Sequence, residues 1–409
     1  MVWTRAVSDP AAASPPLLPL PYQRDVVAYL KETEPELWAW VSSSEALEDY
    51  AREIRTQLLK ENYRLDADGH PELLQRCADV ALKLGVQVPV TLYQANGGFG
   101  MNAMLCYLPG EAHVIFTGPI LSTLKGSELD ALLAHELAHY KLWEMENGDF
   151  LKADRLLITA ANHAGASASH VQTARRFRLY TEIFADRGSL VGCGELEASI
   201  TALVKTETGL ADVSASSYLR QADEIFQHEK ATTQGMDHPE TFIRARALRL
   251  WAENDDMLNT WLTATIEGPL AIDELDLAGQ RQLAQLTRRL LAELLRPVAF
   301  QSDAMLAHAR TFFPDFIPGK TPDGTLVESL RTEDRALREY LCFLLLDFAM
   351  VDRELEHVPL AAALEWSDRM GIAAEFEKLV LKETGLGKRQ ISKLKKETPE
   401  LLKQTEVAV

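Results

Sequence analysis

The stretch LLAHELAHYKLWE, residues 132–144, decides how this chain is interpreted. It carries His135 and His139, with Glu136 beside the first, among leucines and alanines that suit a buried helix. At about 100° per residue, the two histidines fall on one face of a helix, one turn apart. Leu133 and Leu137 point to nearly the opposite side. One face can therefore pack into a core while the other presents two imidazoles to a single metal ion.

The residues before the motif predict where this helix begins. Ser127 is a suitable N-cap, and Glu128 and Asp130 lie in the first turn, where the helix dipole favours acidic side chains. Zinc prefers a rigid element that offers two nitrogens in this way. Glu136 lies off the ligand axis, so it can reach a metal-bound water and act as a general base without binding the metal.

A histidine pair of this spacing can also arise by chance in a chain with ten histidines, and a catalytic zinc needs a third protein ligand. The segment LYTEIFADRGSLV, residues 179–191, supplies Glu182 and Asp186 on one face of a second predicted helix. Glu182 can be the third ligand, and Asp186 can accept a hydrogen bond from a ligand histidine. Acidic pairs at this spacing are common on solvated helices, but the apolar surroundings here favour the metal site.

The segment DHPETFIRARAL, residues 237–248, adds two candidate donors, His238 and Arg244. Hydrolysis of a peptide bond builds negative charge on the carbonyl oxygen, and donors aimed at that oxygen stabilise the transition state. The alternative is that the His-Pro pair merely starts a helix and that Arg244 lies in solvent. The residues alone leave both interpretations open.

Taken in order, LLAHELAH, TEIFAD and HPETFIR resemble the zinc metallopeptidases typified by HtpX and the CaaX prenyl proteases, within the gluzincin group. The resemblance runs from about residue 60 to 250 and includes VIFTGPILSTLKGSELDALLAHELAH, residues 114–139. It implies one Zn²⁺ per chain and a metal-assisted hydrolysis of peptide bonds. The residues it implies are zinc ligands His135, His139 and Glu182, general base Glu136, Asp186 as the partner of a ligand histidine, and His238 and Arg244 as supports of the tetrahedral intermediate.

The resemblance also implies how a peptide or protein substrate binds. A strand beside the cleft, near Asn102, Ala103 and Met104, would pair with the extended substrate. The best-known relatives are embedded in membranes, whereas no segment here offers the run of about eighteen apolar residues that a spanning helix needs. Prenylated or membrane-resident substrates are therefore not expected.

Composition excludes some partners and predicts a compartment. The formal net charge of −18 disfavours nucleic acid and anionic membrane surfaces, which bind clustered lysines and arginines. The four cysteines are scattered and form no C-x-x-C pair, which is typical of reduced thiols in a cytoplasmic protein.

The pattern of apolar residues predicts an α+β, mostly helical fold with a small antiparallel sheet, built from strands at 88–93, 102–107 and 113–118. Glycine- and proline-rich breaks near residues 266–276 and 312–325 punctuate the later helices. The expected domains are a proline-rich leader (1–21), a zinc metallopeptidase domain (22–265) and an all-α C-terminal domain (266–409).

The C-terminal domain resembles, over residues 341–372, the TerB-like helical domain associated with tellurite resistance and stress systems. Its acidic cluster, Asp352, Glu354 and Glu356, is either a metal site or, more simply, a solvated acidic turn. A second function stays open: a catalytically silent or gated scaffold of a stress or defence system that binds a protein partner through this domain. The intact Glu136 favours the enzyme. Residues 163–170, with two histidines, could form a loop over the site.

Overall fold

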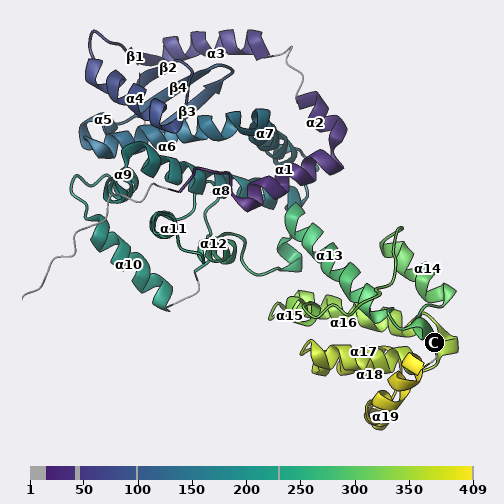
Figure 1. The fold of residues 1–409 in the computed structure, drawn as a ribbon. Helices are drawn as coiled ribbons and strands as arrows, with labels where there is room; N and C mark the ends of the chain where they lie inside the picture. Colours follow the sequence, from purple (N-terminus) through teal and green to yellow (C-terminus); the bar gives the residue numbers. More distant parts are fainter. Residues whose placement is uncertain (1–14, 42–46, 98–99, 229–230, 408–409) are drawn as a thin grey trace, which may run out of the picture. The chain divides into compact units, whose positions relative to one another are not determined.

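The computed structural model describes residues 15–41, 47–97, 100–228 and 231–407 (Figure 1). The chain divides into two compact units, one ending at Gly268 and the other beginning at Pro269. Of the expected leader, residues 1–14 lie outside the described residues. Among the described helices, none combines the length and apolar character that a membrane-spanning segment requires.

The first unit combines helices with one small sheet. Its α-helices are α1 (Pro21–Thr33), α2 (Pro35–Val41), α3 (Leu47–Glu61), α4 (Pro71–Leu84), α5 (Ile120–Thr123), α6 (Ser127–Glu144), α7 (Asp149–Asn162), α8 (Ala168–Cys193), α9 (Leu196–Thr208), α10 (Ala215–His228), α11 (Thr241–Ala252) and α12 (Leu258–Leu262). Its strands are β1 (Asn62–Leu65), β2 (Val90–Ala95), β3 (Asn102–Leu108) and β4 (Glu111–Thr117).

The expected α+β, mostly helical fold with a small sheet is confirmed, but the sheet is mixed rather than antiparallel throughout. The strand order is β1-β2-β4-β3. β1 pairs antiparallel with β2, and β3 with β4, whereas β2 and β4 run parallel. The reason is the tight β3–β4 turn, in which Gly110 adopts a left-handed φ of 76°. It folds β4 back between β2 and β3, so β3 becomes an edge strand of the described sheet.

The two faces of the sheet are covered by different helices (Figure 1). Val114 and Phe116 of β4 belong to the main core with α4 and α6. The neighbouring Ile115 points to the other face, where it packs with Tyr93 of β2 and Leu58 of α3. This alternation follows from the pleat of a strand buried on both faces.

Helix α6 begins one residue earlier than its expected cap implies. The N-cap is Gly126, with φ 57° and ψ −131°, a conformation that glycine adopts more readily than other residues. The prediction of Ser127 as N-cap is therefore wrong; Ser127 is the first helical residue, and its hydroxyl lies 2.9 Å from Glu195 Oε1. Glu128 and Asp130 do occupy the first turn.

Helices α6 and α8 approach each other unusually closely. A Cβ placed on Gly188 would lie 2.2 Å from the Cβ of Ala138, and one on Gly192 would lie 2.2 Å from the Cβ of Ala134. The two glycines are four residues apart on α8, and the two alanines are four residues apart on α6. Each helix therefore presents a matching stripe of small residues to the other. The contact brings the histidine-bearing face of α6 against the acidic face of α8.

The start of α1 is tied to α8. Leu20 is 1% exposed and Gln23 is fully buried. The Gln23 amide donates to Thr181 Oγ1 at 3.2 Å, and the Tyr22 ring stacks on Tyr180 with centroids 4.8 Å apart. The end of the expected leader thus packs against the helix that carries the acidic pair.

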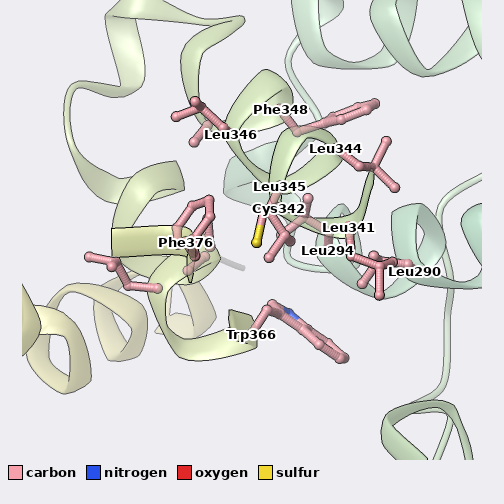
Figure 2. Close-up of a cluster of buried hydrophobic side chains, with 14 of the residues drawn as sticks. Leu290, Leu294, Leu341, Cys342, Leu344, Leu345, Leu346, Phe348, Trp366 and Phe376 are labelled. Carbon is pink, nitrogen blue, oxygen red and sulfur yellow. The ribbon is translucent and has the colours of Figure 1, made fainter. Parts of the chain in front are cut away.

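The second unit is all-helical among its described residues. Its α-helices are α13 (Leu277–Leu294), α14 (Asp303–Phe312), α15 (Leu326–Leu330), α16 (Arg335–Met350), α17 (Val358–Arg369), α18 (Ala373–Glu383) and α19 (Lys388–Val407). Its apolar core gathers side chains such as Leu290, Leu345, Phe348 and Phe376 (Figure 2).

Candidate active site

Two helices bring the predicted metal ligands together. His135 and His139 lie one turn apart on α6, and Glu182 lies on α8. The ligand atoms of these three residues all lie within 4.8 Å of one another. The close contact between α6 and α8 therefore converts two sequence motifs, more than forty residues apart, into one cluster.

The distances suit a tetrahedral metal. His135 Nε2 lies 3.4 Å from Glu182 Oε2, and His139 Nε2 lies 3.6 Å from Glu182 Oε1. Ligands bound to zinc at about 2.0–2.1 Å in a tetrahedron lie about 3.3 Å apart. Glu182 Oε2 is also buried; His238 Nδ1 and Arg244 Nη2 lie 2.9 and 3.3 Å from it, but neither meets it in hydrogen-bond geometry. A buried carboxylate oxygen left in this state is expected where a cation normally supplies the partner.

Asp186 and Arg244 fix the ring of His135. His135 Nδ1 lies 3.2 Å from Asp186 Oδ1. The same carboxylate accepts two hydrogen bonds from Arg244, at 2.8 Å from Nε and 2.7 Å from Nη2. This bidentate pair holds Asp186 rigidly. A proton on Nδ1 is thereby favoured, so Nε2 is the atom that faces Glu182 and that would bind a metal after losing its proton.

The electrostatics of the cluster favour a positive charge between the ligands. Burial lowers the pKa of His135, but the nearby carboxylates of Asp186 and Glu182 outweigh burial and raise it to about 10. Burial raises the pKa of Glu182, but His135, His238 and Arg244 hold it well below its usual range. Burial lowers the pKa of His139 to about 4, so this ring is neutral, as a metal ligand must be.

Glu136 has the environment of a general base. Its side chain is buried, with 5% of the residue exposed. Burial raises its pKa to about 7, and the charge of Glu182 adds to this, while His135 and Arg244 oppose it. A carboxyl group with a pKa near the working pH can both accept and release a proton during turnover.

His238 and Arg244 both reach the cluster. His238 lies in the segment that precedes α11, and Arg244 lies on α11 itself. His238 Nδ1 lies 2.9 Å from Glu182 Oε2, although the imidazole is half-exposed. Arg244 Nη2 lies 3.3 Å from the same oxygen, and this side chain is largely buried. The alternative in which Arg244 lies in solvent is therefore wrong. Its guanidinium is already engaged by carboxylates.

A cleft of about 460 Å³ contains the cluster. The edge strand β3 forms one wall with Asn102, Ala103 and Met104, the three residues expected to bind substrate. Met104 is 50% exposed and Asn102 is exposed too, whereas Ala103 points into the core. The Ala103 N–H donates to Asn102 Oδ1 at 2.9 Å, a local bond that must open if this amide is to pair with another strand.

The structure also brings in residues that the sequence did not single out. From α7, Asp154 and Ile158 line the cleft, and from α9, Leu203, Thr206 and Glu207 do so. No spacing rule in the sequence identifies them, because α7 and α9 reach the cleft through tertiary packing.

Two other sequence features lie outside the site. Neither His163 nor His170 lines the cleft, and His170 belongs to the N-cap of α8 with Ser167. In the second unit, Asp352 accepts the Glu354 N–H at 2.9 Å and forms an ordinary exposed turn. Among the described residues, the only group found with metal-ligand geometry is the one on α6 and α8.

Comparison with protein-family models gives the class. The model of peptidase family M48 matches residues 70–252, which run from the N-cap of α4 to the end of α11. The matched segment is slightly less than half of the chain and contains every residue of the cluster. The match makes this protein a metallopeptidase, a metal-dependent hydrolase of peptide bonds. No curated protein and no solved structure matches the chain.

Proposed function

We propose that this chain is a zinc endopeptidase that cleaves peptides or proteins with one Zn²⁺ held by His135, His139 and Glu182. The observation that carries the proposal is the convergence of these three side chains beside a buried Glu136 in an open cleft. The family match supports metal-dependent hydrolysis in general. The donor set of two imidazoles and one carboxylate supports zinc in particular.

Zinc bound there would polarise the substrate carbonyl and lower the pKa of a coordinated water. Glu136 accepts a proton from the attacking water and delivers it to the leaving nitrogen. Asp186 holds the Nδ1–H of His135, so the ring keeps one tautomer and one orientation during the reaction.

Arg244 and His238 have different roles in this proposal. Because Arg244 donates twice to Asp186, we assign it first to positioning: it fixes the carboxylate that orients His135. His238 is exposed enough to turn from Glu182 toward a substrate, so it is the better candidate donor to the carbonyl oxygen as negative charge develops.

The substrate binds as an added strand in this proposal. An edge strand offers unpaired backbone groups, and β3 runs along the cleft that contains the ligand histidines. Main-chain pairing with residues 102–104 would place an extended peptide across the site. Such binding depends little on the substrate's sequence, so selectivity must come from side-chain pockets.

We propose a cytoplasmic location on the basis of the four unpaired cysteines, three of them buried. The second unit has its own apolar core, so it can act as a separate partner-binding domain. We retain its TerB-like character, and the HtpX or CaaX-protease character of the first unit, as proposals. A scaffold acting through the second unit is the rival function.

The test compares the parent chain with Glu136→Gln on an unfolded casein-type substrate. We expect Glu136→Gln to bind zinc normally while kcat/KM falls by at least about 100-fold, the lower range for a lost general base. Glu144→Gln makes the same change on the same helix outside the cleft lining, and it should retain activity.

Zinc content by mass spectrometry and chelator treatment complete the experiment. Parental turnover by Glu136→Gln would refute the mechanism. Full zinc loading of the parent without chelator-sensitive hydrolysis of any peptide would instead favour the scaffold.

A further inference from the structure

One end of the cleft holds an acidic side chain that no step of the proposed hydrolysis uses. Asp154 of α7 lines the cleft together with Trp143, Ile158 and Arg178. Trp143 lies one turn after His139 on α6, and the two rings are 5.9 Å apart. This end of the cleft therefore lies beside the ligand histidines, within reach of a side chain close to the scissile bond.

Asp154 has no directly paired counter-charge among the described residues. Its carboxylate makes no hydrogen bond or ion pair with any residue that the structure describes. Arg178, the basic residue at this end, is paired with Asp237. Burial raises the pKa of Asp154 to about 6, although Arg178 and Arg155 act to lower it. A cation at contact distance stabilises the ionised form of such a carboxyl group.

The other acidic groups of the cleft are accounted for. Asp186 is bonded to Arg244, and Glu182 faces the candidate zinc. Glu207 lies on α9, which is tied to the start of α6 by the Lys205–Glu128 ion pair, whereas α7 follows the end of α6. Glu207 is exposed to solvent, where water and salt screen its charge. Outside the proposed metal site, Asp154 is thus the partly buried acid among the described lining residues.

Apolar surface flanks this carboxylate. The Trp143 ring is held edge-on against Tyr107, with centroids 5.7 Å apart, and Ile158 is 37% exposed. A long aliphatic stem with a cationic tip fits such surroundings, because the stem covers the ring and Ile158 while the tip reaches Asp154. An acidic side chain would be repelled, and an apolar one would bury Asp154 without a partner.

We propose that Asp154 is a specificity-determining residue that selects a lysine or arginine side chain of the peptide substrate at this end of the cleft. The proposal rests on the proposed peptidase function for the identity of its ligand. The preference itself concerns binding, so it can be measured without turnover.

The experiment uses the full chain carrying Glu136→Gln, loaded with zinc, so that peptides bind without being cleaved. Fluorescent decapeptides carry arginine, or its neutral isostere citrulline, at each position in turn, and anisotropy gives each Kd. We expect one position at which arginine binds about 10- to 100-fold more tightly than citrulline, the range for a charge-assisted hydrogen bond. Adding Asp154→Asn should bring this ratio close to one.

Two further variants control the comparison, and circular dichroism checks the fold of each. Asp154→Glu retains a carboxylate and should retain a preference for arginine. Glu207→Gln removes a carboxylate that α9 contributes to the cleft and should leave the ratio unchanged. An equal loss in Glu207→Gln would mean that the general negative field of the cleft selects the cation, which would overturn the role of Asp154.

The proposal is also overturned if no peptide binds, if the parent ratio is near one at every position, or if the ratio survives Asp154→Asn. Hydrolysis of the same peptides by the chain with intact Glu136 is measured separately. Absence of cleavage alongside an Asp154-dependent ratio would refute the peptidase function and leave the assignment of Asp154 standing.

Discussion

The two units of this protein differ in what is buried beside their apolar cores. In the first, the contact between α6 and α8 buries Glu136, Glu182 and Asp186 around a cleft, beside the largely buried Arg244 of α11. In the second, the largest feature is an apolar core rich in leucine, with Phe348, Trp366 and Phe376 among its members (Figure 2). Burying ionisable groups costs free energy unless each finds a partner, whereas burying leucine stabilises directly.

This difference indicates where function resides and where stability depends on a ligand. A polar interior that violates the ordinary preference for apolar cores is expected at a functional site. Glu182 Oε2 is buried with no partner in full hydrogen-bond geometry, so a cation bound between Glu182 and the two histidines would stabilise this interior further. We therefore expect zinc to stabilise the first unit and to leave the second unchanged.

The largest expected effect tests this asymmetry directly. Glu182→Gln removes one of three metal ligands, and we expect zinc affinity to fall by more than about 100-fold, since loss of an outer partner alone costs about 10- to 100-fold. Affinity is measured by competition with a chromophoric chelator. Hydrogen exchange should show zinc-dependent protection of residues 127–193 in the parent and none in the variant.

The matched control lies in the second unit. Glu293 is also buried, and it accepts the Asp323 N–H at 2.9 Å. Glu293→Gln should leave zinc affinity unchanged. Zinc-dependent protection anywhere in residues 269–409 would contradict the division of roles between the units.

The next effect concerns the apolar interior. Leu345 is fully buried in the core of the second unit. Leu345→Ala should lower the free energy of unfolding of this unit by about 2–5 kcal/mol, the cost of lost apolar contacts and a cavity. Hydrogen exchange locates the loss, and a zinc titration checks the first unit.

A matched substitution sharpens the contrast. Leu133 is fully buried on α6, on the side of the helix nearly opposite the ligand histidines. Leu133→Ala should lower the stability of the first unit and its zinc affinity together, because the same helix carries two ligands. If Leu345→Ala weakened zinc binding equally, the two units would be coupled and the comparison would fail.

Local patterns in the sequence predicted much of the site's arrangement. The spacing of His135 and His139 implies one helix face, and that of Glu182 and Asp186 another, and the structure brings these faces together. The mostly helical fold followed from the same kind of periodicity. The parallel pairing of β2 with β4 could not follow, because it depends on where the β3–β4 hairpin inserts rather than on alternation within a strand.

The residues that line the cleft beyond the metal ligands could not be predicted from the sequence either. Asp154 reaches the cleft because α7 packs against α6 and α8, and nothing near it in the sequence indicates that contact. The N-cap of α6 is Gly126 rather than Ser127, because the chain turns at Gly126 with a positive φ. Serine is a common N-cap residue, so the sequence favoured Ser127 instead. The glycines of DRGSLVG, residues 186–192, did carry a readable signal, since two small residues four apart often mark close helix packing.

The smallest effect tests that signal. Alanine is favoured over glycine in a helix by about 1 kcal/mol, so an unconstrained helical glycine gains stability when replaced by alanine. Replacing Gly188 by alanine should not stabilise the protein, because the new Cβ would lie 2.2 Å from the Cβ of Ala138. We expect Gly188→Ala to lower the free energy of unfolding by about 1–3 kcal/mol, the usual cost of overpacking. Zinc affinity should fall with it, because α8 must move away from the two histidines.

A size swap across the interface separates packing from propensity. Adding Ala138→Gly to Gly188→Ala removes the opposing Cβ, so zinc affinity should recover even though the new glycine in α6 keeps overall stability low. Leu345→Ala is the comparison variant, because it should lower the stability of the second unit and leave zinc affinity unchanged. If the double variant remained as weak in zinc binding as Gly188→Ala, close approach of the two helices would not be what places Glu182 against the histidines.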